Sequence, residues 1–89
     1  MSANEAQKLK VKRMLVDQLH LRMEAEEIGD ATPLFGDEGL GLDSVDAIEL
    51  VAGIEETFGA AFGGEDEARK VLVDVNTLAD YLAAAGKFD

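Results

Sequence analysis

No cysteine occurs in this chain of 89 residues, so neither disulfide bonds nor cysteine-ligated metals can stabilise its fold. A chain this short leaves a large share of its surface in water and can bury only a small core. Apolar packing alone must therefore hold the fold together. No segment alternates between apolar and polar residues as a strand does, so a bundle of helices is the simplest structure that meets this requirement.

The first helix is predicted over about residues 4–21. This segment contains neither glycine nor proline and is rich in good helix formers,. Its larger apolar residues are spaced to line one face: Val11, Met14, Leu15 and Leu19,.

The second helix should begin at Asp43 or Ser44, because either side chain can cap free backbone N–H groups,. It should run to about Phe58 and end at Gly59,.

Two further helices follow. A short helix over residues 65–71 places its acidic residues first and Arg69 and Lys70 last, in the order that a helix dipole favours,. The final helix is capped by Asp74 and closed by Gly86,. Its apolar residues recur with helical spacing: Val75, Leu78, Ala79 and Leu82,.

Residues 23–42 contain four glycines and one proline, and the apolar residues of this segment show no helical spacing,. A loop this long inside a small domain should be functional or held by its own apolar residues. The candidates are Ile28, Leu34, Phe35, Leu40 and Leu42. The sequence therefore predicts an all-α fold: a small bundle of three long helices plus one short helix, with a long loop between the first and second helices. Residues 1–89 should form a single domain.

The net charge is −11 and is unevenly distributed. Residues 1–23 hold five basic and two acidic residues, whereas residues 24–67 hold fourteen acidic residues and no basic one. Such a field repels nucleic acids and anionic lipids and attracts basic protein surfaces. The simpler interpretation is that these acids only keep the domain in solution. With no apolar run long enough to span a membrane and no signal peptide, a cytoplasmic location is expected.

The second helix has two distinct faces. Its core face should contain Ala47, Leu50, Val51, Ile54 and Phe58,. The opposite side carries acids, with Val45, Ile48 and Ala52 among them. An apolar strip framed by carboxylates suits transient docking of basic partners. Alternatively, these side chains face a neighbouring helix; spacing alone favours this for Ile48 and leaves Val45 and Ala52 open.

The segment 41–51, Gly-Leu-Asp-Ser-Val-Asp-Ala-Ile-Glu-Leu-Val, closely resembles the phosphopantetheine attachment motif of acyl carrier proteins. That signature is a Gly-x-Asp-Ser-Leu segment that opens the second helix. The likeness continues over residues 54–58, and the first and last helices resemble their counterparts in the family more loosely. Together these regions cover most of the chain.

The resemblance implies that Ser44 takes a 4'-phosphopantetheine arm from coenzyme A, through a phosphodiester installed by a phosphopantetheinyl transferase. A serine at a helix N-terminus is exposed, and the backbone N–H groups and dipole there favour a phosphate. Asp43 would help to position the transferase and its metal. The partner-docking residues implied are Val45, Asp46, Ile48, Glu49, Ala52, Glu55 and Glu56.

The function implied is that of a carrier and not of an enzyme. The arm would hold acyl groups as thioesters and deliver them to acyl-loading enzymes, synthases or acyltransferases with basic docking surfaces, in fatty acid, lipid or polyketide-type biosynthesis. The carrier would be a monomer. Val45 replaces the usual leucine, Ala52 a larger apolar residue, and the loop is longer than in common fatty-acid carriers. These departures favour a specialised pathway, with housekeeping fatty acid synthesis as the alternative.

Other functions fit the residues less well. His20, the only histidine, lies near the end of a helix with no cysteine or serine partner nearby, so a catalytic role is disfavoured,. The acidic loop around Asp37 and Glu38 lacks the ligand pattern of an EF-hand, and no metal site is predicted,. The remaining alternative is an acidic helical adaptor in which Asp43 and Ser44 only cap a helix and Ser44 is never modified.

Overall fold

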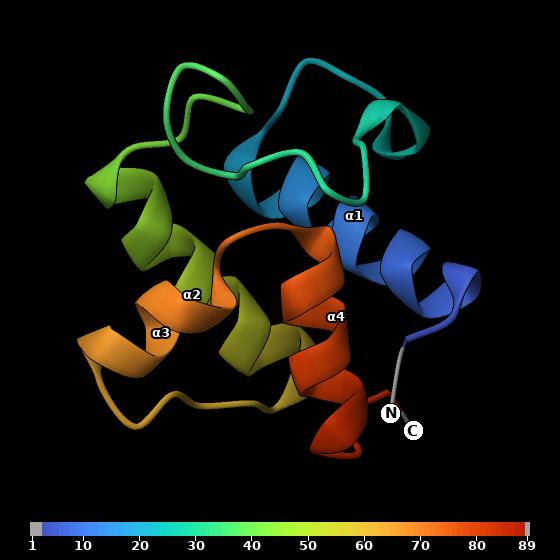
Figure 1. Cartoon of the computed structure of the whole chain (residues 1–89), viewed down its shortest axis with the longest axis vertical. Helices are drawn as coiled ribbons and strands as arrows, with labels where there is room; N and C mark the ends of the chain where they lie inside the picture. The colour runs from blue at the N-terminus through green and yellow to red at the C-terminus, as the bar shows by residue number, and fades with distance from the viewer. Residues whose placement is uncertain (1–2, 89) are drawn as a thin grey trace.

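A computed structural model describes residues 3–88 and contains four α-helices and one short 3-10 helix (Figure 1). Their bounds are α1 Glu5–Leu19, η1 Ala25–Glu27, α2 Ser44–Phe58, α3 Glu65–Val71 and α4 Val75–Ala84. The predicted all-α class is confirmed: the described part of the chain contains no strand, and one isolated bridge pairs Phe35 with Leu42. The single turn η1 within the long loop was not predicted.

Side-chain caps explain why the helices begin where they do. The side chain of Asn4 accepts a hydrogen bond from the Gln7 N–H at 2.8 Å, and the Gln7 side chain accepts one from the Asn4 N–H at 2.9 Å. The Asp74 carboxylate likewise accepts the Thr77 N–H at 2.8 Å and starts α4. Each bond satisfies an N–H group that the helix itself leaves free.

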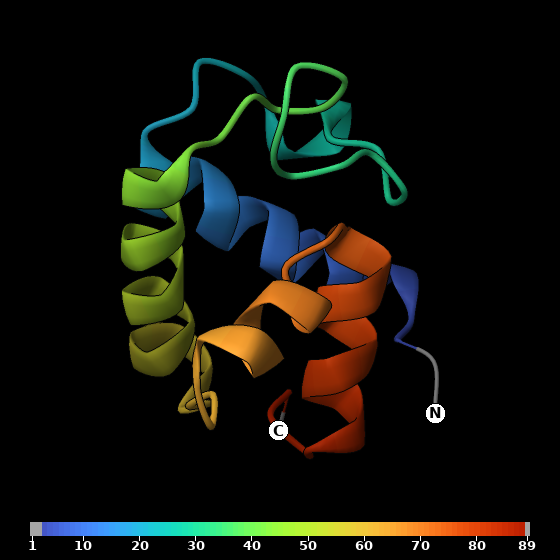
Figure 2. The same ribbon diagram turned by 60° about the vertical axis from the view of Figure 1, so that its left-hand side comes forward.

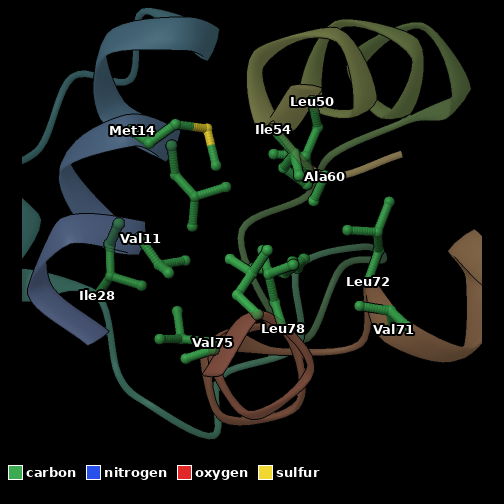
Figure 3. Close-up of a cluster of buried hydrophobic side chains, with 14 of the residues drawn as sticks. Val11, Met14, Ile28, Leu50, Ile54, Ala60, Val71, Leu72, Val75 and Leu78 are labelled. Carbon is green, nitrogen blue, oxygen red and sulfur yellow. The ribbon is translucent and has the colours of Figure 1, made fainter. Parts of the chain in front are cut away.

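The core lies where α1, α2 and α4 converge. Figure 3 shows Val11 of α1, Ile54 of α2 and Leu78 of α4 pointing into the same space, and all three side chains are fully buried. Val71 and Leu72, at the end of α3, close it from one side. Burying a side chain of this size contributes roughly 1.5–3 kcal/mol before conformational entropy is subtracted.

The long loop is held by its own apolar residues, as predicted. Ile28, Leu34 and Leu42 are buried, while Phe35 and Leu40 are only partly buried. Both views show the loop crossing one end of the bundle, at the point where α2 begins (Figures 1 and 2). The loop therefore fixes the position of the first turn of α2.

An ion pair attaches the loop to α1. Lys12 Nζ lies 2.6 Å from one carboxylate oxygen of Asp30, and Lys8 Nζ lies 3.7 Å from the other. The Lys12 ammonium holds the pKa of Asp30 below its usual value. Among the described residues, no helix is both long enough and apolar enough to cross a membrane.

Candidate functional site

Ser44 is the first residue of α2 and is exposed. Two backbone bonds of the preceding loop lead the chain to it: the Leu34 N–H donates to the Val73 carbonyl at 2.9 Å, and the Leu42 N–H donates to the Leu34 carbonyl at 3.2 Å. Because Leu34 and Leu42 are both buried, the chain is anchored immediately before Asp43. The serine hydroxyl is thus presented to solvent from a fixed backbone.

Asp43, and not Ser44, caps α2. One Asp43 carboxylate oxygen accepts the Val45 N–H at 3.0 Å and the Asp46 N–H at 3.1 Å, and the Asp46 carboxylate accepts the Asp43 N–H at 3.0 Å. This reciprocal arrangement is a capping box,. The sequence argument that free N–H groups here would hold a phosphate is therefore wrong for Val45 and Asp46, since both amides are already occupied.

The predicted docking residues share one exposed side of α2. Val45 is 63% and Ile48 is 72% exposed, and they are the most exposed large apolar residues in the described chain. Ala52, Glu49, Glu55 and Glu56 are exposed as well, and Asp46 is partly so.

One expectation is corrected. Spacing alone placed Ile48 against a neighbouring helix, but α2 buries only the narrow face that contains Leu50, Gly53 and Ile54. Ala47, Val51 and Phe58, expected in the core, are partly buried. The reason is that α1 covers one side of α2, while on another side an open groove separates α2 from α3.

The groove has a volume of about 770 Å³ and begins at Ser44. Ile48 and Val51 form its α2 wall, and Ala68 and Leu72 form its α3 wall. The motif did not reveal the α3 wall. The spacing of Ala68 and Leu72, one helical turn apart, was the signal for it.

The two rival sites weighed in the sequence are His20 and the acidic loop. His20 is the exposed residue that ends α1, with a positive φ of 52°. Over residues 3–88, no group of three or more His, Asp or Glu side chains is placed to hold a metal ion.

Comparison with known proteins supports the motif. Residues 10–82 match the family model described as phosphopantetheine attachment site. The chain is 38% identical over 74 residues to an acyl carrier protein of Nitratidesulfovibrio vulgaris strain DP4, covering 83% of this chain and 90% of that protein. It is 33% identical over 78 residues to an acyl carrier protein of Rhodopseudomonas palustris strain TIE-1, covering 88% and 91%.

Proposed function

Since this chain belongs to the acyl carrier protein family, we propose that Ser44 is the residue to which its 4'-phosphopantetheine arm is attached. Membership of the family makes the protein a phosphopantetheine-bearing acyl carrier and not an enzyme. The bound arm supplies a thiol that holds acyl groups as thioesters. The observation that carries the assignment to Ser44 is its place as the exposed first residue of α2, within the matched segment.

The residues around Ser44 fit such an arm. The hydroxyl is accessible to a modifying enzyme, and the groove that starts beside it is lined mainly by apolar side chains. The local charge is less favourable, because Asp43 and Asp46 flank the serine and take the nearest amides. The positive charge that balances the phosphate during attachment must therefore come from the transferase and its metal. In this proposal Asp43 helps to position them through its second carboxylate oxygen, which accepts neither amide,.

Partner enzymes dock, in this proposal, on the exposed side of α2. Its surface combines the apolar side chains of Val45, Ile48 and Ala52 with four acidic residues: Asp46, Glu49, Glu55 and Glu56. Carboxylates steer a basic surface towards the helix and the apolar strip holds it briefly. As a family member the carrier works with a phosphopantetheinyl transferase and with biosynthetic enzymes.

The intact mass of the purified protein tests the attachment site. Incubation with coenzyme A and a broad-specificity phosphopantetheinyl transferase should add one phosphopantetheine to the wild type and none to Ser44→Ala. Ser2 lies outside the described residues, and Ser2→Ala is the matched control that should still be loaded. Loading of Ser44→Ala would place the arm elsewhere. If the folded wild type were not loaded, the protein would be better explained as an acidic helical adaptor, the alternative that family membership does not favour.

A charge reversal tests the docking surface separately. Glu49→Lys/Glu55→Lys should slow loading by the transferase and flatten its dependence on salt. Glu26→Lys/Asp37→Lys makes the same change of charge in the loop and should slow loading much less. Equal rates for the two variants would remove α2 from the docking surface.

The remaining proposals concern the oligomeric state, the location and the pathway of the carrier. We propose a monomeric, cytoplasmic carrier, one domain over residues 1–89, that serves fatty acid, lipid or polyketide-type biosynthesis. Val45 and Ala52 are smaller than the apolar residues usual at these two docking positions, which supports a specialised set of partners.

A further inference from the structure

A hollow of about 420 Å³ gathers basic side chains on this strongly acidic protein. Lys10 and Arg13 of α1 line it together with Lys87, which follows α4. Thr57 and Phe58, at the end of α2, and Phe88 complete its wall. We refer to this hollow, bounded by Lys10, Arg13, Thr57, Phe58, Lys87 and Phe88, as the basic niche.

Among the residues that the structure describes, the cations of the basic niche form no ion pair. Lys8 and Lys12 pair with Asp30, and Arg69 pairs with Glu65. Within residues 3–88, by contrast, no carboxylate forms an ion pair with Lys10, Arg13 or Lys87. Asp17 also lines the niche, so the described lining residues comprise three cations and one carboxylate. These lining residues carry a net positive charge on a chain of net charge −11.

Two aromatic rings line the basic niche. The rings of Phe58 and Phe88 meet edge to face, with centroids 5.4 Å apart and an angle of 72° between them. Both side chains remain partly exposed, and the buried Met14 also lines the niche. Cations around partly exposed aromatic rings fit a ligand that combines carboxylates with an aromatic or apolar group.

The position of the niche relates it to the docking surface on α2. It lies at the end of α2 opposite Ser44, and a helix of this length spans about 20 Å. An ordinary protein interface covers about 800 Å² on each partner, roughly 30 Å across. One partner that docks on α2 can therefore also cover the niche.

Together these observations assign the niche a role. We propose that the basic niche binds an acidic, aromatic-containing segment of the same partner proteins whose basic surface docks on α2. The inference rests on the proposed docking function and extends it. The cations that line the niche and the carboxylates of α2 form separate groups of opposite charge, which admit a partner in one orientation and oppose the reversed one,. The acids of α2 supply the long-range attraction that an acidic segment alone would not find on this chain.

Titration of the ¹⁵N-labelled apo protein with a defined probe tests the niche. The probe is the tetrapeptide Glu-Glu-Phe-Glu, blocked at both ends, in about 0.15 M salt, where the Debye length of about 8 Å limits repulsion by the rest of the chain. Saturable amide shifts are expected at Arg13, Thr57 and Lys87 and not at Ser44 or Ile48. The peptide Lys-Lys-Phe-Lys should leave the niche amides unshifted.

Matched variants identify the residues responsible. Lys10→Gln/Arg13→Gln should weaken binding about fivefold or more, whereas Arg22→Gln/Lys70→Gln, which removes the same charges from other exposed positions, should not weaken it. Asp17→Asn should strengthen binding about two- to fivefold, because it removes the acidic residue among those described as lining the niche,.

Three results would overturn the proposal. They are no saturable shift in the folded wild type, equal affinity in both double variants, or the same shifts with inorganic phosphate alone, which would make the niche a site for small anions. Because the titration uses apo protein, it is independent of loading at Ser44. The proposed function can therefore fail while the niche stands, and the niche can fail while Ser44 is loaded.

Discussion

Asp43 and Ser44 are adjacent, but the structure gives them different tasks. The Asp43 carboxylate accepts hydrogen bonds from the N–H groups of Val45 and Asp46, and the Asp43 N–H donates to the Asp46 carboxylate. Ser44 contributes no capping bond to α2. From the sequence alone, either Asp43 or Ser44 could be assigned as the cap of this helix. Here the residue that starts the helix and the residue proposed for modification are separate, so their effects can be measured separately.

The first prediction concerns this separation. Asp43→Ala should lower the free energy of unfolding by about 1–2 kcal/mol, since it removes the cap and leaves two N–H groups unpaired. Ser44→Ala should change it by less than about 0.5 kcal/mol. Urea unfolding followed by circular dichroism measures both. A loss for Ser44→Ala as large as that for Asp43→Ala would mean that the serine also holds the helix start.

Asp30 gives the second prediction, which depends on pH. Lys12 lowers the pKa of Asp30 in the folded protein, so the ion pair stabilises the fold at neutral pH. This contribution is lost as the pH falls below the usual aspartate pKa of about 4. Asp30→Asn should therefore be less stable than wild type at neutral pH, by a few tenths to about 1 kcal/mol, because the carboxylate is 40% exposed,.

The stability difference between Asp30→Asn and wild type should shrink towards zero in acid. Asp37→Asn, which removes an exposed loop acid without an ion pair among the described residues, is the control. A difference that stays constant from neutral pH to about pH 3 would show that Asp30 acts through its shape and not its charge.

At the scale of helices, the sequence predicted most of the fold because end signals are local. Asp43, Gly59 and Asp74 lie at helix ends, as predicted. Gly59 takes a φ of 67°, the left-handed conformation that glycine adopts readily at a helix end,. The predicted short helix over residues 65–71 matches α3.

What the sequence could not predict depends on neighbours. The turn η1 is three residues long and has no period to detect. The exposure of Ile48 depends on which sides of α2 the other helices leave uncovered. The spacing of residues within α2 does not show which sides those are. The motif predicted Ser44 as the attachment site, and helical spacing predicted the apolar strip of α2; both stay predictions. The groove wall on α3 and the basic niche combine residues distant in sequence, and only the folded chain brings them together.

The third prediction concerns the close approach of α1 and α2. A Cβ added at Gly53 would lie 2.7 Å from Cγ and Cδ of Gln18, and the Gln18 amide donates to the Glu49 carbonyl at 3.1 Å. Gly53→Ala should therefore push Gln18 away, break this bond, and lower the free energy of unfolding by about 1 kcal/mol despite the better helix propensity of alanine.

A double-mutant cycle checks this explanation. In a Gln18→Ala background the obstruction is absent, so Gly53→Ala should instead stabilise the protein by about 0.5–1 kcal/mol. Denaturant unfolding of the four proteins gives the coupling. Equal effects of Gly53→Ala in both backgrounds would mean that Gln18 is not what obstructs a side chain at position 53.

At the scale of the whole molecule, charge is separated in space as well as in sequence. The acids of residues 24–67 lie on the loop, α2 and α3, whereas four of the eight basic residues lie on α1. Lys8 and Lys12 join the two regions by their contact with Asp30. Repulsion among the remaining acids is therefore a cost of the compact state.

The fourth prediction is that salt stabilises the protein. Raising the ionic strength from about 10 mM to about 150 mM shortens the Debye length from about 30 Å to about 8 Å, so Tm should rise by several degrees. Glu55→Gln/Glu56→Gln, with two acids fewer on α2, should show a smaller rise. A Tm that is independent of salt would mean that the acidic regions do not repel one another appreciably in the folded state.

The capping box at Asp43 also bears on how cargo is delivered. Because Asp43 already occupies the amides of Val45 and Asp46, these amides offer a group attached at Ser44 no anchor beyond its covalent bond. A group tethered at one point samples the space around it and reaches a docked partner at an effective concentration of order millimolar, whatever the bulk concentration of the carrier. The docking that we propose on α2 therefore need not be tight for transfer to occur, and a weakly held carrier is free to leave for the next enzyme.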